Sequence, residues 1–172
     1  MVTPLDLLDG LEERMEAILK DYPAAFHGST QKPFNIYRHK VPERMDNRVK
    51  VKGKEETHDD VFPFCIVKVD TGGKERNVAN HDINIQIFIG LENEGLQGEG
   101  YDDVLRCLTR IWNELNRELV VAKFFKLKDE LDWSINTDDA ETHPYYYGLI
   151  RLGFETPSIQ YTGGFESGER RN

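Results

Sequence analysis

The sequence is poor in cysteine and has no long apolar run, and each absence excludes a class of protein. Cys65 and Cys107 are its two cysteines, too few and too far apart for a disulfide framework or a zinc site. No apolar run approaches the ~20 residues of a membrane-spanning helix, and the first residues lack the apolar core of a signal peptide. We therefore expect buried free thiols, no membrane association and a chain made in the cytosol.

Catalytic motifs are also missing. The sequence contains neither the GxxxxGK[ST] phosphate loop nor the GxGxxG dinucleotide fingerprint. The Asp-Thr-Gly triplet at residues 70–72 matches that of aspartic proteases, but the Gly73 that follows makes a hairpin turn the simpler interpretation. We accordingly predict that the protein is not an enzyme and that it needs no cofactor and no metal.

A metal-dependent hydrolase is the alternative from a different class. Histidine and carboxylate side chains are common metal ligands, and two short stretches carry them: His58, Asp59, Asp60, His81 and Asp82. The hypothesis requires these side chains to converge on one cleft. In a chain with five histidines and 31 acidic residues, such short stretches also arise by chance.

The length and composition fit one globular domain. The chain has 172 residues, of which 38% are hydrophobic and 31% are charged, enough for a core surrounded by polar loops. Its net charge of −9 disfavours a general nucleic-acid binder, because such proteins gain affinity from clustered lysine and arginine. An acidic surface is compatible with DNA that passes without binding.

Apolar periodicity predicts an α+β fold. Residues 4–22 and 101–121 repeat apolar side chains at three- and four-residue steps, which is typical of amphipathic helices. Five other segments are expected to be strands: 33–41, 61–70, 77–90, 131–135 and 144–156. The predicted fold is a single domain, 1–157, in which a mainly antiparallel sheet of about five strands carries an N-terminal helix and a long central helix on one face. We expect residues 43–60 to form a charged, protruding ribbon or loop and residues 158–172 a flexible tail.

The strand at residues 83–89 has two different faces. Isoleucine occupies every second position, so four isoleucine side chains share one side of the strand. The other side carries Asn84, Gln86 and Phe88. We expect the isoleucines to pack against the helices. Because charge is depleted at the core of protein interfaces, we interpret the Asn84, Gln86 and Phe88 face as a contact with another subunit or with a tube.

Charged residues of opposite sign cluster in different segments. An alternating segment, residues 48–54, places four basic side chains on one face: Arg48, Lys50, Lys52 and Lys54. Two loops are acidic, with Glu92, Glu94 and Glu99 in the first and Asp138, Asp139 and Glu141 in the second. Copies of the chain that joined head to tail, basic segment against acidic loop, could close into a ring. DNA contact and a solvated edge ribbon are the other interpretations of residues 48–54.

Two stretches resemble the tail terminator, or tail completion, proteins of long-tailed phages and of related contractile, bacteriocin-like particles. The first is NHDINIQIFIGLENEGLQGEGYDDVLRCLTRIWNEL, in which a strand leads through an acidic, glycine-rich loop into a helix. The second is ETHPYYYGLIRLGFETP, in which a His-Pro-Tyr element begins the last strand. The similarity spans roughly residues 60–157, is looser over the first helix, and includes nothing that matches residues 43–60.

This resemblance implies a virion structural protein without an active site. Such a subunit would assemble into a hexameric ring that caps the tail tube or sheath, ends its polymerisation and offers a surface for head-tail joining. The implied partners are further copies of the chain, the tube or sheath protein and a head connector. A head-completion or neck protein of the same particle is the nearest alternative, and a module that binds or inhibits a host factor is another.

Residues 48–54 give the first testable prediction. Reversing the charge of Lys50, Lys52 and Lys54 to glutamate should weaken self-assembly, measured by light scattering. The loss should shrink at high salt, because exposed charges are screened beyond a Debye length of about 8–10 Å. Assembly that is unchanged by the three substitutions would show that this segment takes no part.

Overall fold

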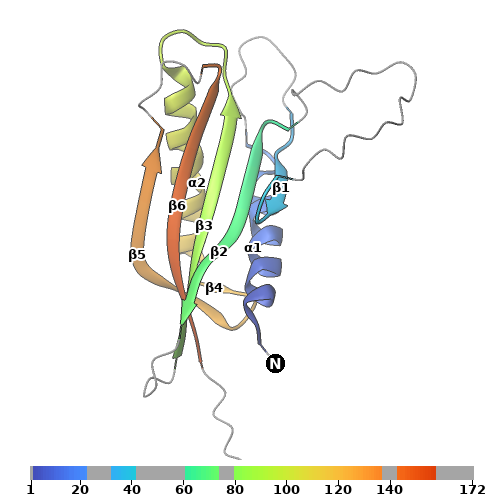
Figure 1. Ribbon diagram of the computed structural model, residues 1–172, viewed down its shortest axis with the longest axis vertical. Coiled ribbons are helices and arrows are strands. Elements are labelled where there is room, and N and C mark those ends of the chain that lie inside the picture. Colours follow the sequence, from blue (N-terminus) through green and yellow to red (C-terminus); the bar gives the residue numbers. More distant parts are fainter. Residues whose placement is uncertain (1, 23–31, 42–60, 74–79, 137–142, 158–172) are drawn as a thin grey trace, which may run out of the picture.

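The computed structural model describes residues 2–22, 32–41, 61–73, 80–136 and 143–157. These residues form two helices on one side of a curled, six-stranded sheet (Figure 1). The helices are α1 (Pro4–Leu19) and α2 (Glu99–Arg117). The strands are β1 (Asn35–Arg38), β2 (Phe64–Gly73), β3 (Asn80–Glu92), β4 (Val120–Val121), β5 (Phe125–Ile135) and β6 (Tyr145–Pro157). The expected α+β class is therefore confirmed.

The sheet is mixed, so the prediction of about five mainly antiparallel strands is wrong in number and in one direction. Its order is β1-β2-β3-β6-β5-β4, and β1 runs parallel to β2, with Asn35 opposite Phe64. The other pairs are antiparallel. Alternation of apolar residues indicates where a strand lies but not its direction, which is set by the partner that it pairs with. The sixth strand, β4, has only two residues, too few for any periodicity to reveal.

The expected long central helix is also absent from the described residues. α2 has 19 residues and α1 has 16, so the two helices are similar in length, and α2 ends at Arg117 instead of at residue 121. Glu118 is extended, with φ −137° and ψ 90°. Val120 and Val121 then pair with β5, because β-branched side chains fit a pleated sheet. In the sequence, Leu119 continues the apolar stripe of the helix, and for that reason we expected the helix to reach residue 121.

The strand expected at residues 131–135 is the end of a longer strand, β5, which begins at Phe125. Its register against β6 shifts between Leu127 and Leu131, so the intervening residues bulge. The side chain of Lys128 lies against Gly153, where an added Cβ would be 3.0 Å from it. Lys128 Nζ is 2.8 Å from Asp82, and this hydrogen bond to Asp82 raises the pKa of Lys128.

The start of α1 follows from its first residues. Pro4 stands at the beginning of the helix, where its missing N–H costs no hydrogen bond. The Asp6 carboxylate accepts hydrogen bonds from Thr3 N, at 2.6 Å, and from Thr3 Oγ1, at 2.9 Å. These bonds lower the pKa of Asp6.

Among the described residues, no helix combines the length and the apolar character that crossing a membrane requires.

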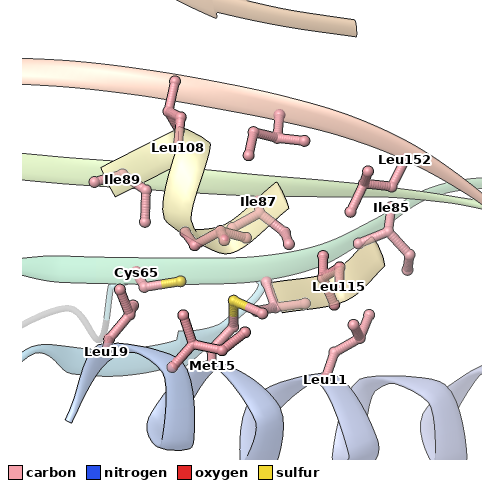
Figure 2. Close-up of a cluster of buried hydrophobic side chains, with 14 of the residues drawn as sticks. Leu11, Met15, Leu19, Cys65, Ile85, Ile87, Ile89, Leu108, Leu115 and Leu152 are labelled. Atoms are coloured by element: carbon pink, nitrogen blue, oxygen red, sulfur yellow. The ribbon is translucent and has the colours of Figure 1, made fainter. Parts of the chain in front are cut away.

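The isoleucine face of β3 is the centre of the core, as expected. Ile83, Ile85, Ile87 and Ile89 are at most 4% exposed. In Figure 2, Leu11, Met15 and Leu19 of α1 point toward Cys65 and the β3 isoleucines, with Leu108 and Leu115 of α2 in the same cluster. At about 1.5–3 kcal/mol for each fully buried side chain, this face contributes several kcal/mol to the stability of the fold.

Both cysteines are buried and free, as predicted. Burial raises the pKa of the Cys107 thiol to about 12 and raises that of Cys65 well above its ordinary value. Because the thiolate is the reactive form, both side chains should be inert in the native state.

We therefore predict that iodoacetamide at pH 8 labels neither cysteine of the folded protein within an hour. In denaturant both should be labelled within minutes, which mass spectrometry can follow and which serves as the control. Rapid modification of the native chain would contradict the buried placement of the thiols.

Candidate functional site

The face of the sheet opposite the helices is the candidate site. Figure 1 looks onto this open face, with α2 behind β3 and β6. Side chains alternate along each strand, so Asn84, Gln86 and Phe88 of β3 lie on the open side while the isoleucines lie on the helix side. The sequence placed these three residues on a separate face, and the structure confirms that separation.

The open face changes in character from one end to the other. In its polar part, Lys68, Gln86, Arg151 and Asp132 lie side by side on four neighbouring strands. In the next row toward the other end, Ile66, Phe88, Leu149 and Ser134 are neighbours. Beyond them, Phe64 and Tyr147 flank Gly90. The face is therefore charged in the row that contains Gln86 and largely apolar from Phe88 to Gly90.

Five aromatic rings form a cluster at the apolar end: Phe62, Phe64, Phe88, Tyr145 and Tyr147. Phe88 stacks on Tyr147 with ring centroids 5.8 Å apart and planes 14° apart. Phe62 stacks on Tyr145 at 4.7 Å, and Phe64 lies 6.0 Å from Phe88. Offset stacking of this kind adds about 0.5–1.5 kcal/mol per pair beyond area burial. The sequence interpretation singled out Phe88 alone, although VFPF and PYYYG also carry aromatic residues at alternate positions.

The polar side of the open face differs from the uncharged surface that we inferred. Asn84 is exposed, and its Nδ2 donates to Thr71 Oγ1 at 2.8 Å. Gln86 lies between Lys68 and Arg151, and Arg151 Nη1 is 2.8 Å from Asp132 Oδ2. Charged side chains from the neighbouring strands thus border the amide side chains. The β3 sequence alone could not reveal these neighbours.

The acidic loop after β3 is held by a buried polar pair. Asn93 is 2% exposed and Asp103 is 5% exposed. Asn93 Nδ2 donates to Asp103 Oδ2 at 2.8 Å, and Asn93 Oδ1 accepts from Gly95 N at 2.7 Å. The sequence analysis missed both residues, because their burial depends on how the loop folds back onto α2.

The acidic candidates of this loop have different surroundings. Glu94 is exposed, whereas Glu92 is half-buried at the end of β3. Glu99 begins α2, and its Oε2 accepts from Gln97 N at 2.8 Å. The remaining charged candidates lie outside the described residues: Arg48, Lys50, Lys52, Lys54, Asp138, Asp139 and Glu141.

The residues of the hydrolase hypothesis are only partly described. His81 and Asp82 are adjacent on β3, so their side chains project from opposite faces of the sheet. Asp82 is bound to Lys128. No group of three metal-binding side chains occurs within the described part of the chain, and His58, Asp59 and Asp60 lie outside it.

A groove of about 1120 Å³ runs on the helix side, between α1, α2 and the β4–β5 turn. Two of its charged residues pair with each other. Arg14 Nη2 is 2.9 Å from Glu118 Oε2, and Arg14 Nη1 donates to Val120 O at 3.3 Å. Gly10 lies close to the turn, where an added Cβ would be 2.9 Å from Val121. These contacts hold the turn against α1. We therefore attribute the groove to the packing of these elements.

Comparison with known proteins gives no assignment: no protein-family model matches the chain, and no curated protein matches it significantly.

The aromatic cluster depends on Gly90, which gives a stability prediction. A Cβ at Gly90 would lie 2.3 Å from the Phe64 ring, so Gly90→Ala should displace the ring and cost about 1–3 kcal/mol of unfolding free energy. Gly73→Ala is the matched control on β2, because a Cβ there meets nothing within 4 Å. Urea denaturation measures both variants, and equal midpoints would contradict the packing of Phe64 over Gly90.

Proposed function

We propose that this chain is a structural protein of a phage tail or phage-tail-like particle, where it forms a hexameric ring at the end of the tail tube or sheath. The ring stops polymerisation and offers a docking surface to a head connector where the particle has a head. It assembles in the cytoplasm of the host bacterium, and DNA at most passes through its lumen. The function includes no catalytic step.

One observation carries this proposal: the two segments with the family resemblance fold into one contiguous unit. Residues 80–115 include β3, the acidic loop and most of α2, and residues 143–157 include β6. β3 pairs with β6 along all 13 of its residues. Asn93 N also donates to Pro144 O at 2.8 Å, so the acidic loop meets the His-Pro-Tyr element. Patterns from separate parts of the sequence are more informative when they meet in space.

The two faces of the sheet further support an assembly role. One face is covered by α1 and α2 in the described residues, whereas the other presents an aromatic cluster beside a polar row. An interface commonly combines such an apolar centre with a polar rim. Aromatic residues are also enriched among the side chains that contribute most to binding.

The test is assembly of purified full-length chain with the tail tube protein of the same particle. We expect native mass spectrometry to show a ring, and electron microscopy to show shorter tubes that carry extra density at one end. A chain that stays monomeric and binds neither tube nor sheath ends would refute the proposal. Binding to the head connector alone would identify a head-completion or neck protein instead.

A pair of arginine substitutions tests whether the open face is used. Gln86→Arg adds a charge to the open face, and Asn113→Arg adds the same charge on the exposed side of α2. Because burying an unpaired charge is costly, Gln86→Arg should weaken ring formation or tube binding about tenfold or more, whereas Asn113→Arg should not. Equal binding by both variants would exclude the open face from the contact.

A further inference from the structure

The outer edge of β5 is a strand edge without a partner in the described residues. β6 pairs with one side of β5. On the other side β4 pairs with Phe125 and Lys126, and Leu127 N donates to Leu119 O at 2.7 Å. Residues 131–135 therefore form an edge, and β5 is the outermost long strand on the left of Figure 1. An unpaired edge is a template for another strand.

The backbone groups at this edge can be identified from the register. Asn136 N donates to Tyr147 O at 3.1 Å. Antiparallel strands alternate between bonded and non-bonded pairs, so the next bonded pairs are Ser134 with Leu149 and Asp132 with Arg151. The N–H and C=O groups of Leu131, Trp133 and Ile135 consequently point away from β6, toward the open edge.

An apolar pocket adjoins the same edge. It holds about 140 Å³ between α2 and the sheet, and its lining residues are Leu105, Leu108, Thr109, Trp112, Leu131, Trp133 and Ile150. Trp133 is 52% exposed, unusual for a side chain of its size. An apolar cavity of roughly 150 Å³ can accommodate a benzene-sized group, so the pocket suits one aliphatic side chain.

Three exposed carboxylates lie within residues 129–132 of this strand. Asp129 and Glu130 are exposed in the bulge of β5, and Asp132 is exposed on the open face. A strand that pairs with residues 131–135 would thus meet apolar side chains on the helix side and carboxylates near its other face. It should alternate apolar with basic residues, since backbone bonds provide affinity and alternate side chains provide specificity.

This chain contains such a sequence in residues 48–52, RVKVK. Alternation would direct Val49 and Val51 to one side and Arg48, Lys50 and Lys52 to the other. We propose that residues 48–52 of a second copy of the chain add as a strand to the β5 edge, with a valine at the Trp133 pocket and the basic side chains near Asp129 and Glu130. The inference rests on the ring in the proposed function, which it deepens by naming the joining contact.

The sheet order favours a second copy over the chain's own segment. Residues 48–52 lie in sequence between β1 and β2, and these strands occupy the sheet edge opposite β5. To reach its own β5, the segment would cross β3 and β6, whereas a neighbour that places its β1 side beside β5 needs no crossing. Contacts between two different edges are head to tail, and a head-to-tail contact closes into a ring when the rotation allows.

A charge exchange between two variants tests the contact. One variant carries Lys50→Glu and Lys52→Glu, and the other carries Asp129→Lys and Glu130→Lys. Each alone should assemble with an apparent dissociation constant about tenfold higher than that of the unmodified chain. Mixed in equal amounts, they should recover assembly, because each junction between the two different variants again joins opposite charges. Native mass spectrometry should show rings in which the variants alternate.

A control and two outcomes complete this test. Glu13→Lys with Glu16→Lys makes the same charge change at exposed positions of α1 and should leave assembly unchanged. Mixing that fails to restore assembly would overturn the proposal, and so would single variants that assemble normally. If residues 48–52 were bound to β5 of their own chain, mixing the two variants would fail to restore assembly.

Hydrogen exchange resolved to single amides provides a second test that involves no substitution. The amides of Leu131, Trp133 and Ile135 should exchange quickly in dilute monomer and become protected in the assembled ring. Those of Asp132 and Ser134 should be protected in both states. Rings in which the first three amides still exchange quickly would overturn the strand addition while leaving the proposed function intact. Protected rings that fail to bind tube ends would instead contradict the proposed function.

Discussion

Burial of the isoleucine face of β3 against the two helices is the interaction on which the rest of the structure depends. β3 is paired on both sides, by β2 and by β6, and its isoleucines are at most 4% exposed. Because side chains alternate with a period of two, a slip by one residue would turn all four toward the open side. The core therefore determines the register of the central strands, and α1 and α2 cover the face that this register makes apolar.

The open face is a consequence of the same register. Once the isoleucines point to the helices, Gln86 and Phe88 must point the other way, into rows completed by neighbouring strands. Phe88 then meets the aromatic side chains of β2 and β6, while Gln86 meets Lys68 and Arg151. Gly90 leaves the space that the Phe64 ring occupies. An apolar area beside charged groups results, suited to the contact with other subunits or with a tube that we propose.

The edges of the sheet differ because of how the strands are ordered. β4 has two residues and pairs with only the beginning of β5, so most of the β5 edge has no neighbour among the described strands. β1 lies at the opposite side of the long strands. Two unlike edges on one subunit are compatible with a closed ring, in which each junction uses one edge of each kind. The proposed strand addition and the proposed ring thus share one topological basis.

The sequence by itself determined the α+β class, the start of α1 and the two faces of β3, because these follow from local capping and from periodicity. It also indicated that Cys65 and Cys107 are buried. Only the tertiary structure decided the parallel direction of β1, the end of α2 at Arg117, and the pairing of Val120 and Val121. The aromatic cluster and the Asn93–Asp103 pair likewise join residues from separate segments. Contacts between distant segments decide these features. Local sequence patterns do not specify which segments meet, and for that reason the features could not be inferred beforehand.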